Sequence, residues 1–163
     1  ASVGGAIPRE FVPAIEAGVR RAAQAGVVAG YPAVDFKATL LDGRAHERDS
    51  SAMAFELAAA AAFREAAAKA GAALLEPVMA VEVTTPAEFV GDVLGDLSRR
   101  RGLVRGQDSR GNAAVVEAHV PLREMFGYIG HLRAMSSGRA QYTMQFERYA
   151  EAPASVLSAV RAG

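Results

Sequence analysis

Residues 74–86 read Leu-Leu-Glu-Pro-Val-Met-Ala-Val-Glu-Val-Thr-Thr-Pro, and this stretch decides how the chain is divided. Over residues 79–84, apolar side chains alternate with small or polar ones, which is the period-two pattern of a strand with one buried face. The closing Thr-Pro pair suits the start of a helix, since proline fits the first helical turn. We therefore expect one module over residues 1–76 and a second over residues 77–163.

Further strands and helices are expected in the second module. One helix with an apolar face ends at Gly102, and another ends near Gly138. The expected strands cover 103–107, 113–120 and 142–147, and the two helix faces consist of Phe89, Val90, Val93, Leu94 and Leu97, and of Leu122, Met125, Phe126, Ile129 and Leu132. Together with the first strand, they give the β-α-β-β-α-β order of a ferredoxin-like sandwich.

The sequence of the first module predicts two helices and one or two strands, which do not make a complete sheet. The first helix ends at Ala25, and an alanine-rich helix begins with an N-cap at one of residues 49–51 and ends near Gly71. Between them, residues 31–41 alternate like a strand. A lone strand leaves its backbone groups unpaired. We infer that pairing strands precede Ala1 or that a partner supplies them.

The composition favours a folded protein with a real core and excludes several kinds of site, while the order of the expected elements gives the fold class α+β. The chain has 163 residues, of which 51% are hydrophobic and 22% charged, with a formal net charge of zero. Any RNA contact must therefore come from local patches. The absence of cysteine excludes disulfides, thiolate metal sites and cysteine nucleophiles. The apolar run at 57–63 is too short to cross a bilayer, and no signal-peptide pattern is visible.

The polar turn that follows the expected strand carries the most suggestive side chains. Asp42 and Gly43 are a strong turn signal, and His46 follows between Arg44 and Arg48. An imidazole can stack on RNA or donate hydrogen bonds to its backbone, and arginines contact phosphate. The same pattern is also typical of a solvated hairpin. His46 has no neighbouring acid–base partner in the sequence, so a catalytic role is not predicted.

A second basic group lies in the second module, at the end of its first helix and in the next strand and turn. The group consists of five arginines, Arg99, Arg100, Arg101, Arg105 and Arg110. They are a candidate patch for contact with RNA phosphates. The alternative for the first three is a favourable interaction with the negative C-terminal end of the helix. Arg139, before the last strand, is a secondary candidate.

For the other candidate residues, structural roles are favoured over metal binding and catalysis. The three histidines lack metal-ligand spacing, so we predict no metal site. Ser50 and Ser51 suit helix capping better than nucleophilic catalysis, because no adjacent histidine base is evident. Phe126 and Tyr128 are able to stack on bases, although a role in the core or at its edge is favoured. We predict no catalytic residue in this chain.

Short motifs in a fixed order cover nearly the whole chain. They lie at residues 4–10 (Gly-Gly-Ala-Ile-Pro-Arg-Glu), 30–32, 41–43, 46–55, 75–79, 82–86, 91–93, 95–97, 99–102, 110–112, 121–122 and 124–128. In this order they resemble the C-terminal part of elongation factor G, a bacterial-type translational GTPase. The resemblance implies an incomplete ribosomal-protein-S5-like domain IV over 1–76 and the ferredoxin-like domain V over 77–163.

The resemblance also implies a function in GTP-dependent translocation of tRNA and mRNA. It places the loop of Gly43, Arg44, His46 and Arg48 at the tip of domain IV, near the codon–anticodon duplex in the decoding centre. His46 would help to uncouple that duplex from the decoding centre. Domain V would lie against the large subunit near the GTPase-associated region, so its five-arginine group would be a patch facing ribosomal RNA. The implied partners are the ribosome, tRNA and mRNA.

The chain departs from the family pattern in two ways. No Gly-x-x-x-x-Gly-Lys-Ser/Thr stretch is present, so GTP and Mg²⁺ belong to a domain outside this chain, which alone is not expected to be an enzyme. Ala52 replaces the glutamate common after Asp-Ser-Ser. With Asp49 as N-cap, Ala52 would be the third helical residue, and the reciprocal bond of a capping box would be lost.

Several alternatives stay open at this point. The chain is either a fragment of the factor or a natural truncated relative that serves as a structural or interaction subunit and borrows pairing from neighbouring chains. A cytoplasmic location is expected, with a mitochondrial or chloroplast one as the alternative, and no membrane partner. The pattern does not separate a housekeeping translocase from a recycling or specialised paralogue.

Overall fold

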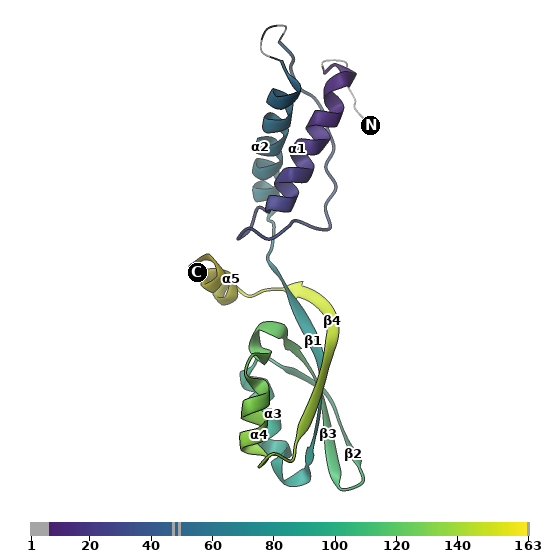
Figure 1. The fold of residues 1–163 in the computed structure, drawn as a ribbon, viewed down its shortest axis with the longest axis vertical. Coiled ribbons are helices and arrows are strands. Elements are labelled where there is room, and N and C mark those ends of the chain that lie inside the picture. The colour runs from purple at the N-terminus through teal and green to yellow at the C-terminus, as the bar shows by residue number, and fades with distance from the viewer. Residues whose placement is uncertain (1–6, 47, 49, 163) are drawn as a thin grey trace. The chain divides into compact units, whose positions relative to one another are not determined.

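A computed structural model describes residues 7–46, 48 and 50–162 and divides the chain into two units (Figure 1). Unit 1 comprises Ala1–Leu74 and Pro153–Gly163, and unit 2 comprises Leu75–Ala152. The N-terminal part of the first motif, residues 4–6, and the candidate N-cap Asp49 lie outside the described residues.

Unit 2, which the structure describes throughout, forms an antiparallel sheet of strand order β2-β3-β1-β4. Its elements are β1 (Leu75–Pro86), η2 (Ala87–Phe89), α3 (Val90–Arg99), β2 (Leu103–Arg110), β3 (Ala113–Pro121), η3 (Leu122–Met125), α4 (Tyr128–Met135) and β4 (Gln141–Glu151). Figure 1 shows α3 and α4 on the same side of the sheet. The predicted βαββαβ order of a ferredoxin-like sandwich is confirmed, and each strand is longer than expected.

The core of unit 2 lies between the sheet and its two helices. Val81 and Val83 of β1 are buried there with Val93 and Leu97 of α3 and Leu132 of α4. Burying side chains of this size contributes about 1.5–3 kcal/mol each. The alternation that predicts β1 and the helical spacing that predicts α3 therefore meet in one apolar layer.

The second predicted helix of this unit is interrupted. Its first part is the short helix η3, and α4 begins only after Gly127, whose φ of +74° suits glycine. This break changes the face that the following residues present. Phe126 and Ile129, expected on the apolar face, are 78% and 42% exposed, whereas Tyr128 is fully buried. The prediction was wrong at these two positions, and the core role favoured for Tyr128 is confirmed.

Unit 1 is built mainly from two long helices. They are preceded and followed by shorter ones, in the order η1 (Arg9–Phe11), α1 (Val12–Ala25), α2 (Ala52–Ala70) and α5 (Ala154–Ala162). The rings of Phe11 and Phe55 stack with centroids 4.6 Å apart, and Arg21 pairs with Glu56 at 2.9 Å. The sequence predicts α1 and α2, but α5 was not expected.

The expected strand at residues 31–41 is absent from the described part of unit 1. An isolated bridge joins Val28 and Tyr31, and the rest of the segment pairs with no strand. Phe36 instead places its ring 5.0 Å from that of Phe63 on α2. The prediction was wrong because alternation gives a strand only when a neighbouring strand pairs with its backbone.

The start of α2 agrees with the expected N-cap at one of residues 49–51. Ser51 is the N-cap, and its hydroxyl accepts a hydrogen bond from the Ala54 N–H at 3.1 Å. Ala52 is therefore the first helical residue, not the third. The loss of a capping box at Ala52, which was expected for Asp49 as N-cap, does not apply, because the side-chain cap comes from Ser51.

Gly18 lies at a close contact between α1 and α2. A Cβ atom at this position would lie 2.2 Å from the backbone carbonyl oxygen of Glu56. Gly18→Ala should therefore separate the helices and lower the free energy of unfolding of unit 1 by about 1–3 kcal/mol. Urea unfolding measures this value.

Gly91→Ala is the control for this substitution. A Cβ at Gly91 of α3 meets no atom within 4 Å. The change should leave unit 2 as stable as before or stabilise it by about 0.5–1 kcal/mol. Equal effects of the two substitutions would contradict the close-contact explanation.

Candidate nucleic-acid interface

The loop that carries His46 is held by a reciprocal contact with Ser50. The His46 N–H donates to the Ser50 hydroxyl at 2.7 Å, and the Ser50 N–H donates to the His46 carbonyl at 3.0 Å. At the other end of the loop, the Gly43 N–H donates to the Asp42 carboxylate at 2.7 Å. These local bonds hold the backbone of His46 and of Gly43.

The candidate side chains of this loop face solvent. Arg44, His46 and Arg48 are all exposed. Their side chains make no ion pair or hydrogen bond with another described residue. Gly43 is half-buried, and a Cβ there would lie 2.4 Å from the Ile7 side chain. The arrangement exposes one imidazole and two guanidinium groups to solvent, and glycine at position 43 allows the Ile7 side chain to pack closely beside them.

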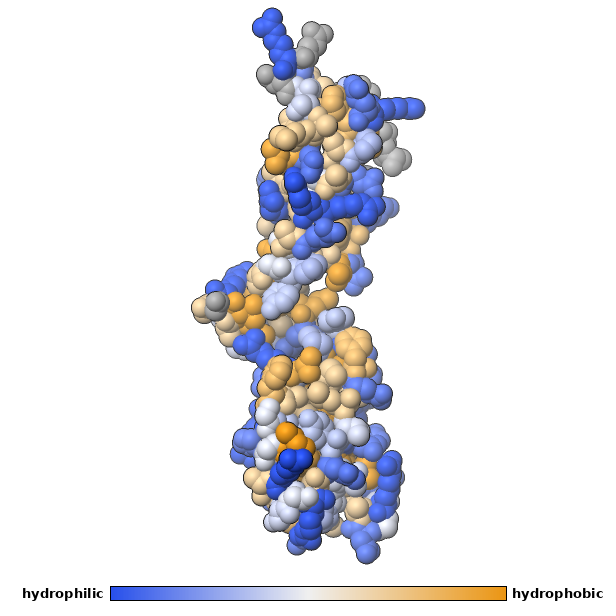
Figure 2. All heavy atoms as spheres, viewed as in Figure 1, coloured by the Kyte–Doolittle hydropathy of each residue, from blue (hydrophilic) through white to orange (hydrophobic). Residues whose placement is uncertain are grey.

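Hydrophobic side chains also reach the surface of unit 1 (Figure 2). In the segment before the loop, Tyr31, Val34 and Leu41 are 56%, 62% and 72% exposed. Met53 and Leu57 of α2 are exposed as well. An unpaired segment with so many exposed apolar side chains is typical of a surface that another piece of protein covers.

The structure places Arg100 and Arg101 in internal ion pairs. Arg101 binds both carboxylate oxygens of Glu76, at 2.7 and 3.0 Å, and also pairs with Glu124 at 3.1 Å. The hydrogen bond to Glu76 has the largest effect in raising the pKa of Arg101. Arg100 pairs with Asp96 at 2.9 Å and lies 5.0 Å from the centre of the Tyr128 ring. Both guanidinium groups therefore hold α3 to neighbouring elements.

The remaining arginines of the predicted patch do not gather at one place. Arg99 is exposed near the end of α3 and donates to the Gly95 carbonyl at 3.3 Å. Arg110 pairs with Glu82 at 3.3 Å, at the far end of β2. A strand rises about 3.3 Å per residue, so the length of β2 separates Arg110 from the end of α3 by roughly 23 Å. The five arginines do not form one continuous basic surface.

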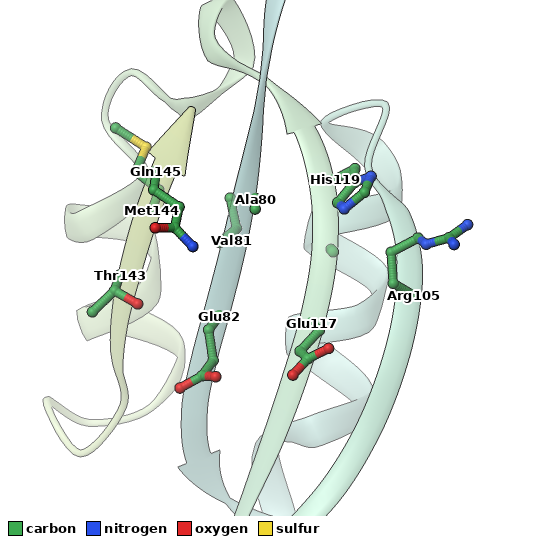
Figure 3. A pocket seen from close by; sticks show the side chains of 10 residues that line it. Ala80, Val81, Glu82, Arg105, Glu117, His119, Thr143, Met144 and Gln145 are labelled. Atoms are coloured by element: carbon green, nitrogen blue, oxygen red, sulfur yellow. The ribbon is translucent and has the colours of Figure 1, made fainter. Parts of the chain in front are cut away.

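The open face of the unit 2 sheet lies opposite α3 and α4 and is hollowed by a shallow cavity of about 360 Å³. Glu82 and Glu117 stand directly opposite each other on β1 and β3, and Arg105 points away from them (Figure 3). His119 Nδ1 lies 3.0 Å from Arg148 Nη1. The only ring in the cavity lining is the imidazole of His119, and the lining includes no phenylalanine, tyrosine or tryptophan. This face therefore lacks the row of large aromatic side chains with which some sheets stack on single-stranded RNA.

Neither a metal cluster nor a membrane helix is found in the described part of the chain. No group of three or more histidine, aspartate or glutamate side chains there is arranged to hold a metal ion. Among the same residues, no helix combines the length and apolar character needed to cross a bilayer.

Two family models cover the chain in succession. The model for elongation factor G, domain IV, matches residues 1–71, and the model for the elongation factor G C-terminus matches residues 73–160. These matches define a region of a translation elongation factor. The chain belongs to the elongation factor G family.

Individual relatives agree with this assignment. Elongation factor G of Granulibacter bethesdensis is 55% identical over 97% of this chain, and that of Rhodopseudomonas palustris is 57% identical over 98%. The chain spans 23% of the length of each. A crystal structure of a Thermus thermophilus protein has a TM-score of 0.79 and 43% identity, covering 98% of this chain and 24% of that protein.

Replacing Arg101 distinguishes an internal role from an RNA contact. Glu76 is only 8% exposed, so Arg101→Ala leaves its carboxylate buried without its main partner. We expect the free energy of unfolding of unit 2 to fall by roughly 2 kcal/mol. Urea unfolding measures this value, and Arg105→Ala, on the exposed face, serves as the control. Equal stability of the two variants would contradict the internal role.

Tyr128 makes the stability of unit 2 depend on pH. Its hydroxyl is buried with no hydrogen-bond partner, and burial, with a smaller effect of Asp96, raises the pKa of this phenol. In the unfolded chain the phenol ionises near pH 10. The stability that depends on the neutral phenol is therefore complete below about pH 10 and falls above it, by up to about 1.4 kcal/mol per pH unit.

Tyr128→Phe should remove this dependence. We expect stability at pH 7 to be unchanged or about 1 kcal/mol higher, because an unpaired buried hydroxyl is removed. The fall in stability between pH 10 and 12 should become less steep, as measured by urea unfolding. Tyr31→Phe, at an exposed position, should leave the pH profile unchanged. A large loss of stability at pH 7 in Tyr128→Phe would show that the hydroxyl has a partner.

Proposed function

We propose that this chain is the ribosome-contacting C-terminal region of elongation factor G and acts in GTP-dependent movement of tRNA and mRNA. Membership of the family supports a role in protein synthesis. The partners are the decoding centre of the small subunit for unit 1 and the GTPase-associated region of the large subunit for unit 2. The chain acts through shape and RNA contact, without covalent chemistry of its own.

The His46 loop is the observation that carries this proposal. Its backbone is held by the two hydrogen bonds with Ser50, while the imidazole faces solvent. A fixed backbone with an exposed ring suits a group that enters a preformed RNA site, because little conformational entropy is lost on contact. Arg44 and Arg48 add phosphate contacts from the same loop.

GTP and Mg²⁺ belong to the rest of the parent factor. The sequence of this chain has no phosphate-binding Gly-x-x-x-x-Gly-Lys-Ser/Thr stretch, and it spans about a quarter of the length of its relatives. In this proposal, the complete factor couples GTP hydrolysis to the positions of these two units on the ribosome.

Substitution of His46 in the complete factor tests the proposal. His46→Ala should slow translocation by about tenfold or more while ribosome-stimulated GTP hydrolysis continues, because the change removes a contact at the tip but leaves the GTPase domain intact. Single-round translocation on programmed ribosomes measures the rate. His131→Ala, an exposed histidine on α4, is the matched control. A near-normal rate for His46→Ala would refute the role of this residue.

A second candidate is supported by the surface of unit 1. Its unpaired segment and exposed apolar side chains would also suit a truncated relative that borrows strands from a neighbouring chain. The reading frame of the gene separates the two candidates. An upstream GTPase domain supports the translocation factor, and a start codon beside Ala1 supports the structural subunit.

A further inference from the structure

A second hollow lies at one end of the unit 2 sheet, separate from the cavity on its open face. It has a volume of about 280 Å³ and is lined by Thr84 at the end of β1, Arg110 and Asn112 at the β2–β3 turn, and Arg139 before β4. The strand register brings these segments together, because Pro86 pairs with Ala113 and Thr84 pairs with Gln141, two residues after Arg139. Two guanidinium groups from opposite sides of β1 therefore share one site.

The chemical character of the lining favours an anion. It includes two arginines, one asparagine and two threonines, and no acidic side chain. Guanidinium groups match phosphate oxygens with paired N–H donors, and amide and hydroxyl groups add further donors. The two carboxylates beside the hollow, Glu82 and Glu88, are each paired with one of its arginines. At the centre of the open face, Glu117 stands opposite Glu82 and adds a second negative charge.

The two arginines are available for exchange of partners. Arg110 pairs with Glu82 at 3.3 Å, and Arg139 pairs with Glu88 while lying 5.0 Å from the centre of the Phe89 ring. Both guanidinium side chains are more than half exposed. Exposed ion pairs contribute about 0–1 kcal/mol, so a phosphate group displaces the carboxylates at small cost. The ion pairs of Arg100 and Arg101 are far less exposed and do not offer this exchange.

We propose that this hollow binds a phosphate of an RNA backbone, held between Arg110 and Arg139 with Asn112 and Thr84 as additional donors. The inference rests on the proposed function, since it gives unit 2 a specific point of contact with ribosomal RNA. It replaces a broad basic patch with a single site at the end of the sheet. It also gives Arg139 a larger role than its position in the sequence suggests.

The test compares two double variants of the full chain with equal loss of charge. Arg110→Gln/Arg139→Gln changes the hollow, and Arg123→Gln/Arg133→Gln changes two exposed arginines elsewhere on unit 2. Binding to purified bacterial ribosomes is measured over a range of KCl concentrations. Unfolding curves establish that both variants fold.

We expect the hollow variant to bind about tenfold more weakly. Its slope of log affinity against log salt should fall by about one for each phosphate that the variant no longer binds. The control variant should weaken by less than about threefold and keep the slope of the unsubstituted chain. Equal behaviour of the two variants would overturn the site and leave the proposed function standing. Failure of the unsubstituted chain to bind ribosomes would instead count against the proposed function.

Titration with inorganic phosphate separates the site from the function. Backbone amide shifts of the full chain should change at Thr84, Asn112 and Arg139, and these changes should disappear in Arg110→Gln/Arg139→Gln. Absence of local shifts overturns the site whether or not ribosomes bind. Local shifts with phosphate, but unchanged ribosome affinity in the hollow variant, would overturn the assignment to RNA.

Discussion

Backbone pairing is the constraint on which the rest of this structure depends. In unit 2, β1 pairs with β3 on one side and with β4 on the other, so its backbone groups are satisfied along most of its length. In the described part of unit 1, residues 31–41 have a similar alternating pattern, but apart from the isolated Val28–Tyr31 bridge no strand pairs with them. The same kind of sequence therefore gives a sheet in one unit and an irregular segment in the other.

This difference shows how much of the fold the sequence predicts. The βαββαβ order was predictable because each element carries its own local signal, such as the alternation of Met79, Val81 and Val83. The break at Gly127 was not, since a continuous apolar spacing hides a single residue with positive φ. α5 was not predicted, and it is a short helix of nine residues. Strand formation at 31–41 depends on residues far from it in sequence.

The candidate site shows a similar division. Exposure of His46, Arg44 and Arg48 follows from their place in a polar turn, whereas their contact with RNA is a prediction drawn from the family. The run Arg99 to Arg101 suggests one basic surface, but α3 ends within it and Arg101 has a positive φ, so the three side chains reach different partners. Burial and partner carboxylates, which come from distant segments, decide which of these charges are available to a ligand. Sequence spacing contains no information on those partners.

The backbone conformation of Arg101 limits which residues can occupy position 101. Its φ of +58° is one that glycine adopts freely and that costs other residues about 1–2 kcal/mol. Arginine occupies this position because its fork closes on Glu76. A glycine there would relax the backbone but leave a buried carboxylate without its partner. Positions 76 and 101 should therefore vary as a pair among relatives, with a neutral residue at 76 wherever glycine stands at 101.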